Sequence, residues 1–90
     1  MNPHYFFPPA DAYRLNRALF RLKSDPAYRQ RFAADREAAM SEAGIAAEVR
    51  GALAAFDRDR LVGFGAHPYL VFMADLRLKM DRAPAAFEKF

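Results

Sequence analysis

The sequence contains no cysteine and no tryptophan. Without cysteine the chain forms no disulfide, has no thiolate nucleophile and lacks every cysteine-based metal motif. The absence of disulfides is typical of proteins in a reducing compartment. Residues 1–9 lack the basic start and long apolar run of a secretory signal peptide. No uninterrupted apolar stretch approaches the roughly 18 residues of a membrane-spanning helix. We therefore expect a cytoplasmic protein with no membrane association.

Side chains able to carry out catalysis or to bind a metal are also scarce. The chain has two histidines, His4 and His67, and two serines, Ser24 and Ser41. The histidines lie far apart in sequence, and an iron site of two histidines and one carboxylate would have to use both. The segment 63–65 lacks the third glycine, the preceding strand and the lysine of a phosphate-binding loop. We expect no catalytic residue, no metal ligand and no cofactor in this chain.

Apolar and aromatic side chains, by contrast, are abundant. Of the 90 residues 53% are hydrophobic, and they include nine Phe, four Tyr and four Met. A chain of this length forms one domain and buries about 60–65% of the surface that its unfolded form exposes. Aromatic residues beyond the needs of so thin a core suggest a surface that faces another chain.

The net charge of +3 is unevenly distributed. Residues 11–36 hold seven Arg or Lys against three Asp, whereas residues 37–90 sum to −1. A basic segment of this kind binds nucleic acid through counterion release or forms a solvated face paired with carboxylates. Nucleic-acid binding is the less favoured alternative, and its arginines would be Arg14, Arg17, Arg21, Arg29 and Arg31.

Hydrophobic periodicity predicts an all-α fold, a compact bundle of about five helices in a single domain over residues 1–90. An extended arm rich in Pro and Phe covers residues 1–9, a helical core residues 10–82, and a tail residues 83–90. Spacings of i, i+3, i+4 and i+7 define two apolar stripes in the core: Leu15, Ala18, Leu19, Leu22, and Val49, Ala52, Leu53, Phe56.

The first three predicted helices cover residues 10–23, 26–43 and 46–56. Asp25 caps the second of them, and Asp35 marks a point where this helix could bend and restart. The second helix is predicted to end in a left-handed glycine, Gly44. A glycine inside the third, Gly51, is interpreted as the site of a close helix–helix contact.

The C-terminal half is predicted as a polar corner over residues 57–60, a short turn over 61–65 and a last helix over 68–80. The glycines of the turn, Gly63 and Gly65, indicate unusual dihedral angles or close backbone approach. The apolar face of the last helix is predicted from Tyr69, Phe72, Met73, Leu76 and Met80. An alternating pattern after residue 74 leaves a strand there as the less favoured alternative.

One segment, residues 64–70, combines several functional residue types. His67 and Tyr69 lie at the start of the last predicted helix and follow a glycine turn. Helix N-termini offer free N–H groups and the positive end of the helix dipole, so this segment is a candidate ligand-facing site. In the plainer alternative, which residue types alone favour, His67 caps the helix and Tyr69 packs in the core.

Three pieces of the sequence, taken in order, resemble the small alpha subunit of aromatic-ring-opening extradiol dioxygenases of the protocatechuate 4,5-dioxygenase type, the LigA-like family. The resemblance spans roughly residues 13–80. Better-known members carry Asn and an aliphatic residue where this chain has His67 and Pro68, so the substrate contacts of that pair do not carry over. The pieces are Leu15-Asn16-Arg17, Tyr28-Arg29-Gln30-Arg31-Phe32 followed by Asp35, and Gly65-Ala66-His67-Pro68-Tyr69.

The resemblance implies a helical, non-catalytic alpha subunit that packs on a larger catalytic beta subunit. The beta subunit of such an enzyme holds Fe(II) and opens the ring of an aromatic diol bound near the subunit interface. The alpha subunit closes the mouth of that active site. By position, the lid and substrate-contacting segment of this chain would be His67, Pro68, Tyr69 and Leu70. The alternative is a stand-alone module of the same fold that binds another protein or a small ligand.

Overall fold

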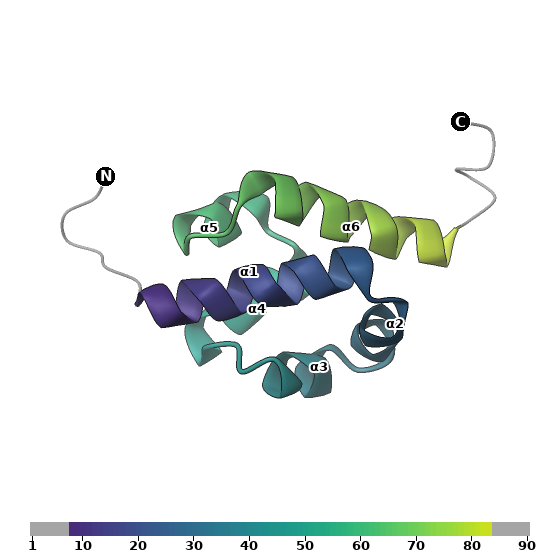
Figure 1. The fold of residues 1–90 in the computed structure, drawn as a ribbon, viewed down its shortest axis with the longest axis horizontal. Coiled ribbons are helices and arrows are strands. Elements are labelled where there is room, and N and C mark those ends of the chain that lie inside the picture. Colours follow the sequence, from purple (N-terminus) through teal and green to yellow (C-terminus); the bar gives the residue numbers. More distant parts are fainter. Residues whose placement is uncertain (1–7, 84–90) are drawn as a thin grey trace.

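The computed structural model describes residues 8–83, and nearly all of them are helical (Figure 1). This part of the chain contains six helices and no strand: α1 (Pro9–Ser24), α2 (Pro26–Ala34), α3 (Arg36–Glu42), α4 (Ala47–Ala55), α5 (Arg58–Gly63) and α6 (Pro68–Arg82). The predicted all-α bundle is therefore confirmed, with one helix more than expected. None of these helices is long and apolar enough to span a bilayer.

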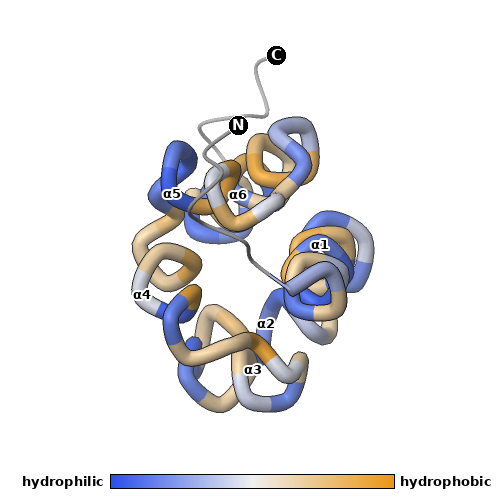
Figure 2. Tube along the Cα trace, turned by 90° about the vertical axis from the view of Figure 1, so that its left-hand side faces the viewer, coloured by the Kyte–Doolittle hydropathy of each residue, from blue (hydrophilic) through white to orange (hydrophobic). Residues whose placement is uncertain are grey.

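The helices form a closed ring in which each packs mainly on its sequence neighbours and α1 packs on α6. Helices α1 and α6 lie side by side and run in the same direction (Figure 1). Seen from the end of the molecule, α1, α3, α4 and α6 surround the interior (Figure 2). The pairing of the first and last helices places segments about fifty residues apart in contact.

Every helix contributes buried apolar side chains to one core inside this ring. The two predicted stripes lie in it, because their spacing places all members of a stripe on one side of a helix; only Phe56 at the end of α4 is partly exposed. The core residues are Leu15, Ala18, Leu19, Leu22, Tyr28, Phe32, Ala39, Met40, Ile45, Val49, Ala52, Leu53, Leu61, Ala66, Val71, Ala74 and Leu78.

Two aspartates divide the N-terminal half as predicted. The Asp25 carboxylate accepts hydrogen bonds from the backbone N–H groups of Ala27 and Tyr28 at 3.1 and 3.2 Å, which caps α2. The Asp35 carboxylate accepts from the N–H of Ala38 at 3.1 Å and caps α3. The predicted bend in residues 26–43 is thus a complete break between two helices.

Helices α3 and α4 both end in a left-handed residue. Gly44 has φ +70°, as predicted, and the N–H of Ile45 donates to the carbonyl of Met40 at 3.0 Å. After α4 the left-handed residue is Phe56, with φ 49°, although such a conformation is unfavourable for a side chain this large. Its ring packs edge-on against Phe32, with ring centroids 6.1 Å apart.

The prediction for residues 57–65 is wrong, and two helix boundaries differ by one or two residues from the prediction. Residues 57–65 were assigned to a corner and a turn, but Asp57 accepts a hydrogen bond from the N–H of Arg60 and starts α5. The predicted last helix is confirmed over the alternative strand, and α6 continues two residues further than predicted, to Arg82. Helix α1 begins at Pro9, since proline is well suited to a first helical position, where its missing N–H costs nothing.

Two sequence interpretations of packing are also wrong. The buried face of α6 consists of Val71, Ala74 and Leu78, and the predicted Tyr69 and Phe72 are exposed. A Cβ added at Gly51 or Gly63 would meet nothing within 4 Å, and neither glycine has a positive φ. The predicted arm and tail lie largely outside the described residues, because residues 1–7 and 84–90 are not described.

Candidate functional site

The candidate lid segment follows a tight turn at the end of α5. Gly65 has φ +97°, and its N–H donates to the carbonyl of Val62 at 2.9 Å, while the N–H of Ala66 donates to that of Leu61 at 3.0 Å. These two bonds form the glycine-terminated helix ending known as the Schellman motif. A Cβ at Gly65 would lie 3.1 Å from the Cβ of Ala12 in α1. The prediction of close approach and unusual dihedrals is confirmed at this glycine.

The side chain of Asn16 fastens this turn to α1. Its amide Nδ2 donates to the carbonyl oxygen of Gly65 at 3.0 Å and to that of Ala12, also at 3.0 Å. Its Oδ1 accepts from the backbone N–H of His67 at 2.7 Å. The turn is therefore held from both sides by one residue that lies 49 and 51 positions earlier in the chain.

His67 caps α6, as the plainer alternative predicts. Its Nδ1 accepts a hydrogen bond from the N–H of Tyr69 at 3.1 Å, and the two rings pack edge-on with centroids 6.5 Å apart. The other half of that alternative is wrong, since the Tyr69 side chain is 54% exposed and does not pack in the core. Both rings are therefore presented to the surroundings.

The four residues assigned to the lid divide into an exposed part and an anchor. His67, Pro68 and Tyr69 are exposed, and Pro68 occupies the first turn of α6. Leu70 is partly buried and packs against the core. The first three can contact a partner or ligand, while Leu70 holds them on the domain.

Exposed aromatic side chains lie on both members of the α1–α6 pair. Phe72 on α6, one turn beyond Tyr69, is 60% exposed, and Tyr13 and Phe20 on α1 are 65% and 54% exposed. Aromatic residues are enriched in protein–protein interfaces because they combine a large contact area with few rotatable bonds. These positions fit the surplus of aromatics noted in the sequence.

The second matched piece is a structural joint at the opposite end of α1. Arg29 is buried; its Nε donates to the Asp81 carboxylate at 2.6 Å and its Nη1 to the carbonyl of Leu22 at 3.1 Å. One guanidinium thus links the ends of α1 and α6. Neighbouring Phe32 is fully buried in the core.

A polar cluster built around Tyr28 ties α2 to α3. The phenol of Tyr28 donates to the carbonyl of Ala39 at 2.8 Å, and burial raises the pKa of this phenol above its usual value. The Arg21 guanidinium lies 4.1 Å from the centre of the tyrosine ring. Glu42 accepts hydrogen bonds from Arg31 at 2.8 Å and from Arg21 at 3.1 Å. The bond from Arg31, supported by Arg21, lowers the pKa of the Glu42 carboxyl.

The five arginines of the nucleic-acid alternative do not form one free basic surface. Arg14 pairs with Asp11, Arg21 and Arg31 pair with Glu42, and Arg29 pairs with Asp81. Arg17 alone of the five has no hydrogen-bonding or ionic partner among residues 8–83. This pairing leaves one unpaired arginine of the five, whereas nucleic-acid binding depends on several phosphate contacts.

Within residues 8–83 there is no group of three or more histidine, cysteine or carboxylate side chains that could hold a metal ion. His4, the other histidine considered as a ligand, lies outside the described residues.

Asn16 is the residue whose role was not anticipated from the sequence. It appeared there only as part of a matched piece. One signal for this role was available. Asn16 follows Leu15 of the buried stripe, and a polar side chain beside a core position normally forms specific hydrogen bonds.

Comparison with known proteins identifies the family. No curated protein and no solved structure matches the chain. The family model described as "Aromatic-ring-opening dioxygenase LigAB, LigA subunit" matches residues 15–88. This match includes all three pieces noted in the sequence and covers most of its length, so the chain belongs to the LigA subunit family of aromatic-ring-opening dioxygenases.

Proposed function

We propose that this chain is the non-catalytic alpha subunit of an extradiol, ring-opening dioxygenase of the protocatechuate 4,5 type. In this proposal it packs on a catalytic beta subunit that holds Fe(II), and its exposed turn closes the active site over an aromatic diol. The family match supports a role as a subunit. Iron belongs to the partner in this arrangement, and we expect this chain to act in the cytoplasm.

The observation that carries the proposal is the combination of exposure and rigidity at residues 67–69. A segment that covers an active site must present side chains to the partner while holding them in a fixed position. His67 and Tyr69 are exposed, yet the backbone between them is fixed by Asn16 on one side and by the cap of α6 on the other. Closure of this kind excludes water from the reacting groups.

The test uses the purified chain, the catalytic subunit of an extradiol dioxygenase, and a catechol such as protocatechuate. We expect no ring cleavage by this chain with Fe(II), and an increase in kcat/KM when it is added to the catalytic subunit. Tyr69→Ala should reduce this increase by about tenfold or more, because loss of one positioned contact in a closed site weakens transition-state binding. Glu48→Ala is the control, because Glu48 is exposed but lies on α4, outside the α1–α6 pair.

Equal effects of the two variants would contradict the lid assignment while leaving the subunit role intact. Stoichiometric Fe(II) bound by the isolated chain would contradict the non-catalytic role itself. The alternative of a stand-alone module is favoured by the aromatics exposed on α1 and α6. It predicts binding of another protein or small ligand with no effect on ring cleavage.

A further inference from the structure

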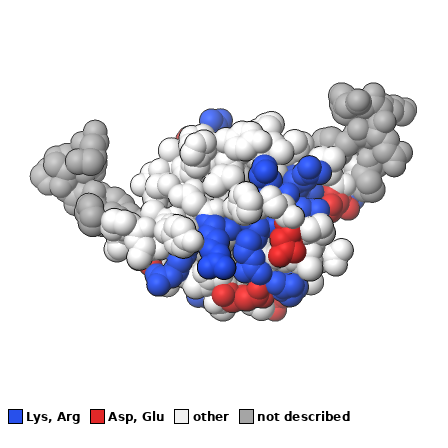
Figure 3. Space-filling model, viewed as in Figure 1, with Lys and Arg blue, Asp and Glu red and all other residues white. Residues whose placement is uncertain are grey.

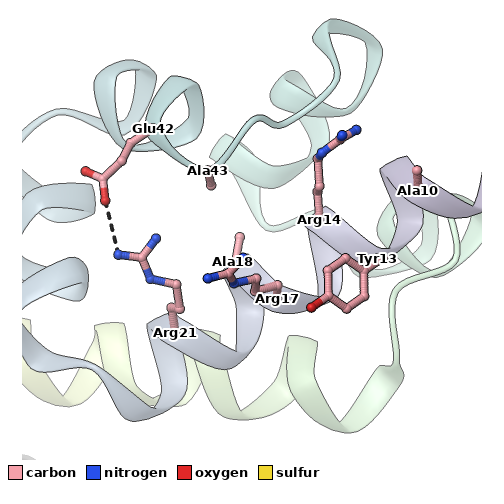
Figure 4. A pocket seen from close by; sticks show the side chains of 8 residues that line it. All are labelled: Ala10, Tyr13, Arg14, Arg17, Ala18, Arg21, Glu42 and Ala43. Atoms are coloured by element: carbon pink, nitrogen blue, oxygen red, sulfur yellow. Dashed lines mark hydrogen bonds and ion pairs between the residues drawn. The ribbon is translucent and has the colours of Figure 1, made fainter.

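A groove of about 390 Å³ lies between α1 and the end of α3, away from the lid segment (Figure 4). Tyr13, Arg14, Arg17 and Arg21 line it along α1, and Glu42 and Ala43 form the facing wall. No residue of the 64–70 segment borders it. Its volume falls within the range of small-molecule sites, about 300–1,000 Å³.

The groove carries an excess of positive charge. Its three arginines face one carboxylate, Glu42, which is already held by Arg21 at 3.1 Å and by Arg31 at 2.8 Å. Arg14 pairs at 3.1 Å with Asp11, which does not line the groove. Basic side chains gather across the middle of α1 in Figure 3. The groove therefore attracts anions, and its own carboxylate does not cancel that attraction.

Arg17 is the group in this groove that no structural role explains. It is exposed, has no ionic or hydrogen-bonding partner among the described residues, and lies one helical turn from both Arg14 and Arg21. Like charges three and four residues apart repel one another and destabilise a helix. An oxyanion bound by Arg17 would relieve this repulsion, and the planar fork of a guanidinium matches a carboxylate or phosphate.

Tyr13 and Ala10 lie at the other end of the groove, with Arg14 beside them in Figure 4. Tyr13, which is 65% exposed, lies at the end opposite to the Arg21–Glu42 pair in Figure 4. Ala10 and Ala43 add methyl groups to the lining. A ligand with a charged head and an apolar body would pair its head with the arginines and place its body against Tyr13.

We propose that this groove binds a small organic anion. Its carboxylate or phosphate group lies at Arg17, between Arg14 and Arg21, and its apolar body lies against Tyr13. This site is separate from the lid, and it does not depend on the identity of the catalytic partner.

The test is a titration of the full chain with benzoate and with phenyl phosphate at constant ionic strength, followed by backbone and arginine Nε–H signals in NMR spectra. We expect saturable shifts along the groove face of α1 and at the end of α3, and none with neutral benzyl alcohol. Arg17→Gln should weaken binding at least about tenfold, because a charge-assisted bond is lost. Comparison of the two anions identifies which oxyanion the site prefers.

Arg77→Gln is the matched control, because Arg77 is an exposed arginine on α6 and its removal changes the net charge equally. Tyr13→Ala tests the contact with the apolar body and should weaken both anions severalfold. Equal weakening by the two arginine variants, or shifts that never saturate, would overturn the proposal in favour of general surface attraction. Binding of hexaglutamate without binding of either small anion would overturn it in favour of an acidic protein segment.

Discussion

The amide oxygen of Asn16 in α1 accepts a 2.7 Å hydrogen bond from the backbone N–H of His67, 51 residues later, at the entry to α6. The amide nitrogen of the same side chain reaches the carbonyl of Gly65. Two of the three family-like pieces of the sequence are thus in direct contact. Asn16 therefore fixes the position of the lid segment relative to α1.

Replacement of Asn16 should loosen the turn without unfolding the domain. Asn16→Ala leaves the N–H of His67 and the carbonyl of Gly65 without their partner, and we expect a loss of about 1–3 kcal/mol in the free energy of unfolding. Urea denaturation measures the loss, and hydrogen exchange at the His67 amide should accelerate. Asn16→Asp keeps the acceptor for His67 but not the donor, so His67 should remain more protected in it than in the alanine variant.

The glycines at positions 65 and 51 should respond to alanine in opposite directions. Gly65→Ala places a Cβ 3.1 Å from that of Ala12 at a φ of +97°, and the strained backbone should cost about 1–3 kcal/mol. Gly51→Ala adds a methyl group to a helical position with nothing within 4 Å and should stabilise the chain by about 0.5–1 kcal/mol. Midpoints of thermal unfolding measure both. A stable Gly65→Ala variant would contradict the close packing of the turn on α1.

Acid should weaken the connection of α3 to α2, and with it the contact of Glu42 with Arg21 on α1. The Arg31 hydrogen bond lowers the folded-state pKa of Glu42 below the unfolded value of about 4.5. The resulting stabilisation is present above pH 4.5 and is lost as the pH falls through the lowered folded-state pKa. In urea titrations at several pH values, Glu42→Gln should be less stable than the unchanged chain near neutrality, and this difference should shrink in acid.

Glu48→Gln provides the control for that measurement, because Glu48 is exposed and makes no ion pair among the described residues. Its effect on stability should vary less with pH than that of Glu42→Gln. Indistinguishable pH profiles for the two variants would show that the contacts of Arg21 and Arg31 with Glu42 do not stabilise the fold.

The buried Arg29 should tolerate replacement poorly. Arg29→Met removes the donor that satisfies the Leu22 carbonyl and leaves Asp81 without its ion pair. We expect a loss of about 1–3 kcal/mol, because one buried acceptor becomes unsatisfied. Asp81→Asn should cost less, since the Asp81 side chain is 45% exposed and water can replace part of the contact. Equal costs in urea denaturation would contradict this asymmetry.

Local signals predicted the N-terminal half of the fold well. Leu15, Leu19 and Leu22 share a face through helical periodicity alone, and Asp25 and Asp35 cap helices through bonds to residues two or three positions away. Such features depend on near neighbours in the sequence. For that reason they were readable without knowledge of the tertiary structure.

The features missed from the sequence depend on distant contacts. Phe56 adopts a left-handed conformation where the backbone closes α4, with the N–H of Asp57 donating to the carbonyl of Ala52 at 2.9 Å, and its ring packs on Phe32. No local signal favours a phenylalanine there. On α6 a second apolar stripe, with Tyr69 and Phe72, competed with the truly buried Val71 and Ala74. The packing of α6 on α1 determines which of the two stripes is buried. The sequence pattern did not reveal that these two helices pack together.

For the candidate site, the resemblance located residues 67–70 and residue types suggested the His67 cap. The Asn16 bonds that hold the segment required the structure, because they join α1 to a turn about fifty residues away. The role of the segment as a lid stays a prediction.

The closed ring of helices has a consequence for how the chain folds. The contact between α1 and α6 encloses almost the whole described sequence, so it carries the largest loop-closure entropy of any helix pair here. During synthesis α1 emerges before α6, and its flank stays uncovered until α6 has left the ribosome. The Asn16–His67 bond therefore forms late, and a chain truncated before residue 68 would expose the flank of α1 that α6 normally covers.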